Sequence, residues 1–301
     1  VFGQWLSGMA RLSHATGDSA LRDKALTLMA EWGKTLPKLS FGHYDYDKYV
    51  CGLADLAEFA GSGEALTLLA QLTDRAEHSL GRVRLPATDA DSQGGYFNGE
   101  GEWYTLSENL YRAYALTGDA RYREFAAVWH YPHYWGMFTG DATPAPDGFH
   151  GYSHVNTLSS AAMAYAVTGE AHYLETITRA YDYFQRTQCY ATGGYGPGEK
   201  LMRADGSLGR SVETEPNAKF LSGSVGRSFE TPCGTWAVFK LCHYLLQLTG
   251  EARYGDWMER LLYNGIGAAL PMQGRGQTFY YADYRLRDAR AEARAMEREA
   301  D

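Results

Sequence analysis

The thiol of Cys233 is the side chain whose position most clearly favours metal binding or nucleophilic reactivity. It follows Glu230 by three residues and opens a strongly amphipathic, helix-like segment. A thiol near a helix N-terminus has a lowered pKa and is easily metallated or made reactive, and a carboxylate three residues earlier is a second donor that a borderline metal accepts. Metal ligation or thiol reactivity is one interpretation of Cys233, and ordinary packing is the other.

The other cysteines and the clustered histidines form no comparable pattern. Cys51, Cys189 and Cys242 make no Cys-x-x-Cys pair, so a four-thiolate zinc site is not indicated. We expect Cys51 and Cys242 to be buried thiols, and reduced thiols favour a cytoplasmic location. Three histidines of one loop lack the His-x-x-x-His spacing of a helical metal site, so packing or solvated roles are expected. These are His130, His133 and His150.

A recurring Thr-Gly-Asp/Glu phrase identifies the elements that must position these groups. Each copy lies between two segments with helical spacing of apolar residues. The glycine ends one helix because it reaches a left-handed backbone at least cost, and the acid begins the next helix, where it faces the positive end of the dipole. The repeat predicts helical hairpins with tight turns. The copies are 16–18, 117–119, 168–170 and 249–251, with 60–62 as a degraded fifth.

Hairpins of one hand either stack into an open solenoid or close into a toroid. A solenoid normally keeps a near-constant period, whereas long Gly-, Pro- and aromatic-rich connectors at 86–101, 131–151 and 189–229 stretch the period here. Long loops at one end of a regular scaffold usually carry function. We predict an all-α fold of the (α/α)6-type toroid of helical hairpins, either incomplete or complete in this chain, with the site at the long-loop end.

One catalytic-type domain and a tail are expected. Residues 1–284 contain the hairpins, whereas 285–301 is a run of Arg, Ala, Asp and Glu with almost no apolar face, which predicts a frayed or foreign segment. The chain begins at Val1 without Met or a secretion signal, and its first residues already read as a helix. The helices are fewer than a closed six-hairpin toroid needs, so we expect a piece of a longer gene product.

Composition restricts the partners. The formal net charge is −8 and no basic stripe is present, so nucleic acid is not an expected partner. No apolar run is long enough to span a bilayer. Aromatic residues make up 14% of the chain, with 23 Tyr and 7 Trp, and many lie in the loops. Loop aromatics mixed with His, Asp and Glu suit sugar rings, and packing within the loops is the alternative.

Several motifs together resemble the β-L-arabinofuranosidase family of glycoside hydrolases. Members carry a Glu-Thr-Cys motif that opens a helix, then Lys-Leu and Arg-x-Leu-Tyr-Asn elements, and 230–241 and 259–264 stand in those places here. Upstream, 192–199 resembles the Gly-Gly loop that bears a glutamate, and 153–156 resembles a Gly-His element that opens an inner helix. The likeness covers nearly the whole chain in the correct order.

The resemblance implies a retaining hydrolase that acts on a pentofuranose or related sugar of plant or microbial polysaccharide. Such enzymes bind zinc through one glutamate and three cysteines, and a zinc-bound cysteine attacks the anomeric carbon. By position, Glu230 and Cys233 would be zinc ligands, Glu199 the general acid/base, and His154 a sugar contact. Zinc keeps a thiolate ionised, and an enclosed acid can hold a raised pKa. Capping or solvation is the alternative for Glu199, and packing for His154. A homodimer is also compatible with the resemblance.

The chain departs from the family pattern in two places. Pro232 lengthens the spacing from glutamate to cysteine by one residue. The downstream Cys-Cys pair, which supplies the nucleophile and one ligand in the family, is missing after 279–285, where the Arg/Ala/Glu run begins. We therefore expect a glycosidase-type fold whose activity is in doubt for this chain.

Further candidates for substrate contact come from hairpin starts and loops. The stretch 43–49 alternates aromatic and charged groups at a hairpin start, and 102–104 occupies an equivalent place. Glu102 or Glu108 would then be the second carboxylate of an ordinary two-carboxylate glycosidase. The substrate-binding candidates are His154, Asp47, Lys48, Glu102, Tyr104 and Tyr195. Two acids of a polar stretch, Glu213 and Glu215, are interpreted as surface charges.

Two other function classes stay open. One is a different carbohydrate-active toroid, such as a polysaccharide lyase, an unsaturated-uronide hydrolase or a sugar epimerase, which uses Tyr, His and Arg or paired acids and no zinc. The other is a non-catalytic sugar-binding scaffold. Zinc that is lost on Cys233→Ala would favour the thiolate site, and sugar binding without turnover would favour the scaffold.

Overall fold

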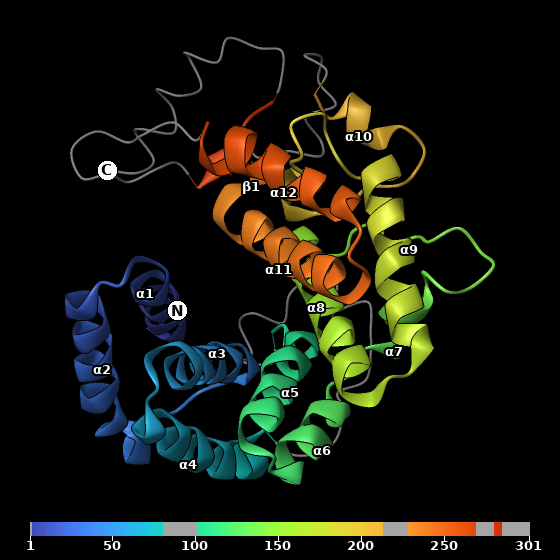
Figure 1. Cartoon of the computed structure of the whole chain (residues 1–301). Coiled ribbons are helices and arrows are strands. Elements are labelled where there is room, and N and C mark those ends of the chain that lie inside the picture. The colour runs from blue at the N-terminus through green and yellow to red at the C-terminus, as the bar shows by residue number, and fades with distance from the viewer. Residues whose placement is uncertain (1, 81–100, 213–227, 269–279, 285–301) are drawn as a thin grey trace. The chain divides into compact units, whose positions relative to one another are not determined.

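A computed structural model describes residues 2–80, 101–212, 228–268 and 280–284. The chain divides into two compact units, Val1–His130 and Tyr131–Asp301, which we call the N-terminal and C-terminal units (Figure 1). Helices dominate both units, and the described residues contain one ladder of two short strands. The predicted all-α class is thus confirmed. The predicted tail at 285–301 and the acids Glu213 and Glu215 lie outside the described residues.

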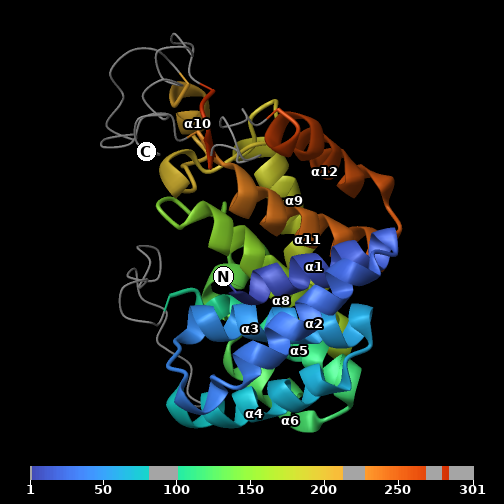
Figure 2. The same cartoon turned by 90° about the vertical axis from the view of Figure 1, so that its left-hand side faces the viewer.

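The N-terminal unit consists of paired helices arranged around α3. Helix α3 packs against α1, α4 and α5, and Figure 2 shows α1 and α2 side by side within this unit. The side chains of Leu53 and Leu56 on α3 are fully buried. The elements are α1 (Phe2–Thr16), α2 (Ser19–Gly33), η1 (Leu36–Lys38), α3 (His43–Ala60), α4 (Gly63–Ser79), η4 (Trp103–Thr105), α5 (Leu106–Thr117) and α6 (Ala120–Val128).

The predicted hairpin turns are confirmed, and the turn at Gly118 shows how the sequence specifies them. Gly118 has a left-handed backbone, with φ of 72° and ψ of 0°, which glycine adopts without the steric cost of a Cβ atom. The Thr117 hydroxyl donates to the Ala113 carbonyl at 2.7 Å. The Asp119 carboxylate then accepts from the backbone N–H of Arg121 at 3.0 Å and caps the next helix. Left-handed glycines also end helices at Gly61, Gly169 and Gly250.

The C-terminal unit is organised by the contact between α8 and α11. All residues of α8 from Gly151 to Ala164 are buried, so this helix forms the interior of the unit. The connector 131–151 contains a short helix, α7. The elements are α7 (Pro132–Gly136), α8 (Gly151–Thr168), α9 (Ala171–Thr187), η5 (Pro197–Glu199), α10 (Ser207–Arg210), β1 (Phe229–Glu230), α11 (Thr231–Thr249), η7 (Ala252–Tyr254), α12 (Gly255–Leu261), the π-helix η8 (Leu262–Ile266) and β2 (Tyr281–Ala282).

Aromatic side chains fill the interior of the C-terminal unit around the long connectors. Phe184 of α9 stacks on Trp257 of α12, with ring centroids 6.2 Å apart, and Tyr195 packs against Trp257 and Phe229 at 5.7 and 5.6 Å. Such ring pairs add to the burial of their apolar area. The connector before η5 is therefore anchored to α9, α12 and β1.

A search of the described helices for a candidate membrane span found none that combines the required length and apolar character.

Candidate functional site

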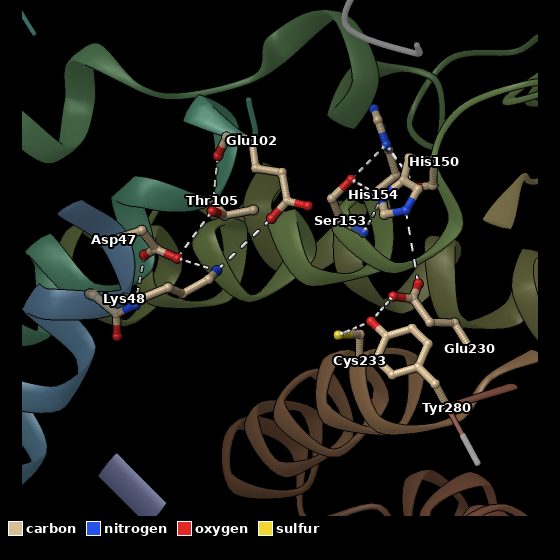
Figure 3. A network of polar contacts seen from close by, with 11 residues as sticks. Asp47, Lys48, Glu102, Thr105, His150, Ser153, His154, Glu230, Cys233 and Tyr280 are labelled. Atoms are coloured by element: carbon tan, nitrogen blue, oxygen red, sulfur yellow. Dashed lines mark hydrogen bonds and ion pairs between the residues drawn. The ribbon is translucent and has the colours of Figure 1, made fainter. Parts of the chain in front are cut away.

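Two glutamates of the C-terminal unit face one histidine. His150 lies at the N-cap of α8, Glu199 ends η5, and Glu230 ends β1 at the start of α11. The His150 Nε2 atom lies 3.6 Å from Glu199 Oε2 and 3.8 Å from Glu230 Oε2, and Figure 3 shows the His150–Glu230 contact. Three segments far apart in sequence thus bring two carboxylates and an imidazole together.

The position of Glu199 follows from an unusual backbone path. Gly196 and Gly198 have φ of 70° and 62°, and Glu199 itself has φ of 65°. A non-glycine residue in this region is uncommon and is often found at functional sites. The loop is held by backbone bonds: Lys200 pairs with His150 in an antiparallel bridge, and Leu201 N donates to Phe149 O at 2.8 Å. The side chain of Glu199 is 29% exposed, so it is open to a ligand.

A phenol connects Glu230 with Cys233. The Tyr280 hydroxyl donates to Glu230 Oε1 and lies 2.9 Å from Cys233 Sγ (Figure 3). Because the single phenol proton goes to the carboxylate, the thiol donates to the phenol oxygen. The pairing of β1 with β2 places these groups, since Thr231 N donates to Tyr280 O at 2.9 Å. Cys233 and Glu230 therefore converge on one point, the hydroxyl of Tyr280.

Burial raises the pKa of the Glu230 carboxyl, and the hydrogen bond from Tyr280 and the charge of His150 act against that rise. Burial also raises the pKa of the Tyr280 phenol well above its usual value, and the Glu230 carboxylate adds to this effect. Tyr280 is consequently a proton donor at any physiological pH. A carboxyl with a raised pKa beside a second carboxyl is typical of acid/base sites.

His154, a predicted sugar contact, lies one helical turn after His150 and is fully buried. Its Nδ1 lies 2.9 Å from the His150 carbonyl oxygen, and its ring contacts Phe149 and Tyr134 with centroids 4.7 and 4.8 Å apart. Burial lowers the pKa of His154 well below the usual value, so the ring stays neutral at physiological pH. Its position supports His150, and its sugar contact stays a prediction.

Tyr195, also predicted to bind substrate, is 2% exposed and lies in the aromatic interior. Its hydroxyl donates to the Gly234 carbonyl at 3.1 Å. This contact ties the loop that precedes Glu199 to the first turn of α11, next to Cys233. A sugar contact by Tyr195 stays a prediction.

In the N-terminal unit, Asp47, Lys48 and Glu102 form a buried charged cluster. Lys48 Nζ lies 2.7 Å from Asp47 Oδ2 and 3.9 Å from Glu102 Oε2, and each of these side chains is at most 3% exposed (Figure 3). Asp47 also accepts from Thr105 Oγ1 at 3.2 Å and from Asn109 Nδ2 at 2.8 Å. Burial opposes the charged form of Lys48, yet the two carboxylates outweigh it and raise the pKa of Lys48. The structure therefore joins Asp47, Lys48 and Glu102, three predicted substrate-binding residues, in one cluster.

Tyr104, another predicted substrate-binding residue, lies in η4 directly after Glu102. It is 2% exposed, and its ring meets Trp103 edge-on with centroids 5.5 Å apart. Glu108, the other candidate for a second carboxylate, is 3% exposed on α5. Substrate contact by these residues, and by Asp47, Lys48 and Glu102, stays a prediction.

The donors available for zinc are Glu230 and Cys233. Both reach the same phenol oxygen, so they are able to bind one ion between them, and a carboxylate with a thiolate suits zinc. Within the described ranges, no group of three or more His, Cys, Asp or Glu side chains has the geometry of a metal site. Glu230 and Cys233 therefore fit zinc in donor type and would be two of the four ligands that it normally takes.

Sequence reasoning missed three site residues: His150, Tyr280, and Tyr281, whose hydroxyl donates to Glu199 Oε1. The spacing of His150 from His130 and His133 indicates no metal site, but His150 stands four positions before His154 at the start of a helix, which is itself a His-x-x-x-His spacing. In the N-terminal unit, His130 Nε2 instead contacts the Tyr111 hydroxyl at 2.6 Å. No local pattern marked the tyrosines, because their partners lie far away in sequence.

Comparison with known proteins gives one consistent family. The profile of the β-L-arabinofuranosidase GH127 catalytic domain matches residues 26–299. A solved GH127 β-arabinofuranosidase is similar with a TM-score of 0.61 and 18% identity over 93% of this chain and 46% of that chain. A structure described as a glycoside hydrolase has a TM-score of 0.62 and 17% identity, over 93% of this chain and 48% of that chain. A GH127 β-L-arabinofuranosidase from Geobacillus stearothermophilus T6 has a TM-score of 0.63 and 14% identity, over 99% of this chain and 51% of that chain.

The chain thus spans about half the length of the solved structures that it matches. At these identities the likeness establishes a shared fold, that of the helical toroid enzymes, as the hairpin repeat predicted. No curated protein sequence matches the chain significantly.

Proposed function

Because the chain belongs to the GH127 β-L-arabinofuranosidase catalytic-domain family, we propose that it is the catalytic part of a glycoside hydrolase. Its substrate would be a β-linked L-arabinofuranosyl or related pentofuranosyl residue of plant or microbial polysaccharide. The observation that carries the proposal is the convergence of Glu199 and Glu230 on His150. This convergence places the proposed acid, Glu199, next to Glu230, one of the two proposed zinc ligands.

Glu199 is the general acid/base in this proposal. Its carboxyl donates a proton to the glycosidic oxygen while the bond from that oxygen to the anomeric carbon breaks, so the alcohol leaves neutral. In the second step the Glu199 carboxylate takes a proton from a water whose oxygen bonds to the anomeric carbon, while the bond from that carbon to the nucleophile of the first step breaks. Partial exposure of its side chain and its hydrogen bond from Tyr281 suit this role, since the group is both reachable and oriented.

We further propose that hydrolysis retains the anomeric configuration, which requires a nucleophile that bonds to the anomeric carbon during the first step. The family pattern uses an adjacent cysteine pair, and the four cysteines of this sequence include no such pair. We therefore expect the chain alone to bind the sugar and to turn it over slowly.

The test uses an alkyl β-L-arabinofuranoside, whose leaving alcohol needs a proton, with the full chain and two matched variants. Glu199→Gln should reduce the release of arabinose by about 100-fold or more, the size of a general acid's contribution, while sugar binding by calorimetry persists. Glu175→Gln, which alters an exposed glutamate of the same unit paired with Arg179, should have no effect. Equal rates for the two variants, or a first-formed product of inverted configuration by proton NMR, would contradict the proposal.

Zinc is the proposed cofactor, with Glu230 and Cys233 as two of its ligands. A bound zinc ion would supply a Lewis acid and keep thiolates ionised. Elemental analysis of the purified chain should find zinc, and Cys233→Ala should lose it. Cys242→Ala alters a fully buried thiol of the same helix and should keep the metal. Zinc content that is independent of Cys233 would remove this residue from the ligand set.

A metal-independent hydrolase that uses two carboxyl groups is the second candidate function. The raised pKa of Glu230 beside Glu199 favours it, because one protonated and one ionised carboxyl divide the acid and nucleophile roles. Turnover that survives complete removal of metal by a chelator would favour this candidate over the zinc enzyme.

The remaining substrate-binding candidates are proposed to contact the sugar rather than to react with it. Their substitution should raise KM more than it lowers kcat. They are His154, Asp47, Lys48, Glu102, Tyr104 and Tyr195.

A further inference from the structure

Ser153 contacts the edge of the His150 ring that carries Nδ1. The backbone N–H of Ser153 points at His150 Nδ1 at 3.5 Å, and the Ser153 hydroxyl lies 2.9 Å from the same nitrogen. A backbone N–H only donates, so Nδ1 must present a lone pair to it. Ser153 therefore favours the tautomer of His150 that carries its hydrogen on Nε2.

His154 does not accept the proton of the Ser153 hydroxyl. The His154 Nδ1 atom lies 2.9 Å from the His150 carbonyl, which only accepts, so His154 carries its hydrogen on Nδ1. The Ser153 oxygen lies 3.4 Å from that protonated nitrogen, which has no lone pair to accept the hydroxyl proton. Donation of that proton to His150 Nδ1, 2.9 Å away, selects the same tautomer as the backbone N–H of Ser153.

The opposite edge of the His150 ring faces the two carboxylates. The distances of 3.6 and 3.8 Å from Nε2 to Glu199 Oε2 and Glu230 Oε2 lie within ion-pair range and slightly beyond hydrogen-bond length. Catalytic contacts often tighten only when substrate binds. Each carboxylate is held at its other oxygen by a tyrosine, Glu199 by Tyr281 and Glu230 by Tyr280. One oxygen of each carboxylate is thus fixed, and the other is directed at His150.

We propose that His150 is a positioning residue, held by Ser153 as the Nε2–H tautomer, whose N–H orients the second oxygen of both Glu199 and Glu230. The proposal rests on the proposed function for the acid role of Glu199. Nε2 carries hydrogen whether the ring is neutral or charged, so the arrangement does not depend on titration of His150. Loss of this N–H frees Glu199 to rotate about its Tyr281 contact, which impairs delivery of the proton to the leaving oxygen.

A mere capping role is the alternative, and two substitutions separate the roles. Asparagine is among the preferred N-cap residues, so His150→Asn keeps the cap of α8 but is too short to reach the carboxylates. His150→Gln retains an N–H near the Nε2 position and weakens the cap. Positioning predicts that Gln preserves more activity than Asn, whereas capping predicts that Asn is the better replacement.

The first experiment does not require turnover and uses the full chain. Correlation spectra of 15N-labelled imidazoles identify the protonated nitrogen of each histidine, and His150→Gln assigns the signal. We expect the Nε2–H form for His150, and a mixture of tautomers or the Nδ1–H form in Ser153→Ala. A wild-type Nδ1–H form, or a spectrum that Ser153→Ala leaves unchanged, would overturn the proposal whatever the enzyme hydrolyses.

The second experiment measures kcat for aryl and alkyl arabinofuranosides. Alkyl leaving groups need the acid more than nitrophenol does, so His150→Asn should lower kcat about tenfold or more for alkyl substrates and much less for nitrophenyl. KM should change little, and His150→Gln should recover part of the loss. His172→Gln is the control, since His172 lies the same 3.6 Å from Glu170 on the surface. Equal losses for both leaving groups, or Asn outperforming Gln, would assign His150 to capping alone. Absence of turnover in every protein would count against the proposed function and leave the spectra to decide the role of Ser153.

Discussion

The hydroxyl of Tyr281 donates a hydrogen bond to Glu199 Oε1 across 82 positions of sequence. The same residue is the cross-strand partner of Glu230 in the ladder between β1 and β2. One two-residue strand therefore connects the loop that carries the proposed acid to the start of α11, where the buried glutamate lies. Glu199, in a left-handed conformation on a glycine-rich loop, depends on this contact for its orientation.

Tyr281→Phe should lower kcat about tenfold while KM stays nearly constant. The substitution removes one hydrogen bond to a carboxylate and leaves the ring in place, so the free energy of unfolding should fall by about 1–3 kcal/mol. Steady-state kinetics and urea denaturation check the two numbers. Tyr190→Phe is the matched control, because it removes a 2.5 Å hydrogen bond to Ser211 in the same unit. A similar loss of kcat in both variants would refute a specific role for Tyr281.

Asp55 should make the N-terminal unit sensitive to acid. Its buried carboxylate accepts from Ser7 at 2.5 Å, from Arg11 at 2.7 and 2.8 Å, and from Arg112. Burial favours the neutral acid, but the guanidinium groups of Arg112 and Arg11 outweigh it and lower the pKa of Asp55. A lowered folded-state pKa contributes stability that is present above the unfolded value of about 4 and is lost as pH falls through the folded value.

Asp55→Asn should therefore cost about 3 kcal/mol at neutral pH, since it leaves the Arg112 charge poorly compensated, and should flatten the loss of stability below about pH 4. Denaturation at a series of pH values measures both effects. Asp74→Asn is the control: Asp74 is 60% exposed in its pair with Arg121, and exposed pairs contribute about 0–1 kcal/mol. If the free energy of unfolding of Asp55→Asn falls as steeply at acid pH as that of the wild type, Asp55 is not the origin of the acid sensitivity.

Lys48 should be the member of the buried charged cluster that stability depends on most. Lys48→Met removes the positive charge between Asp47 and Glu102 and leaves two buried carboxylates, which should cost about 3–5 kcal/mol. Adding Glu102→Gln removes one of the repelling charges, so the double variant should be more stable than the sum of the single effects by about 0.5–3 kcal/mol. If the changes in the free energy of unfolding of the two single variants simply add, Lys48 and Glu102, which lie 3.9 Å apart, are not energetically coupled.

The helices and their turns could be predicted because the signals are local. Glycine after threonine and before an acid predicts a left-handed helix end, and Gly118 and Gly169 adopt that geometry. Cys233 could be singled out because its place at a helix start is also local. Glu199 was identified only through resemblance, since an acid in a glycine-rich loop equally suits solvation.

The rest of the site could not be predicted because it depends on long-range contacts. Tyr280 reaches Glu230 across 50 positions, and a two-residue strand leaves no periodicity to detect. The place of His150 in the site could be predicted only by knowing that the loop before α8 pairs with the residue after η5. Likewise, the burial of Lys48 is not apparent in a stretch that alternates aromatic and charged residues.

Gly52 should be irreplaceable even by alanine, because α3 meets α1 there backbone to backbone. A Cβ atom on Gly52 would lie 2.4 Å from the Gly3 carbonyl oxygen, and one on Gly3 would lie 1.7 Å from the Lys48 carbonyl oxygen. Alanine favours a helix by about 1 kcal/mol over glycine, but overpacking against rigid backbone costs about 1–3 kcal/mol or more. Gly52→Ala should therefore lower the free energy of unfolding, whereas Gly63→Ala, where nothing lies within 4 Å of the added carbon, should leave it equal or higher. Urea denaturation of the two variants measures the difference, and a Gly52→Ala protein as stable as Gly63→Ala would mean that α1 is free to move away from α3.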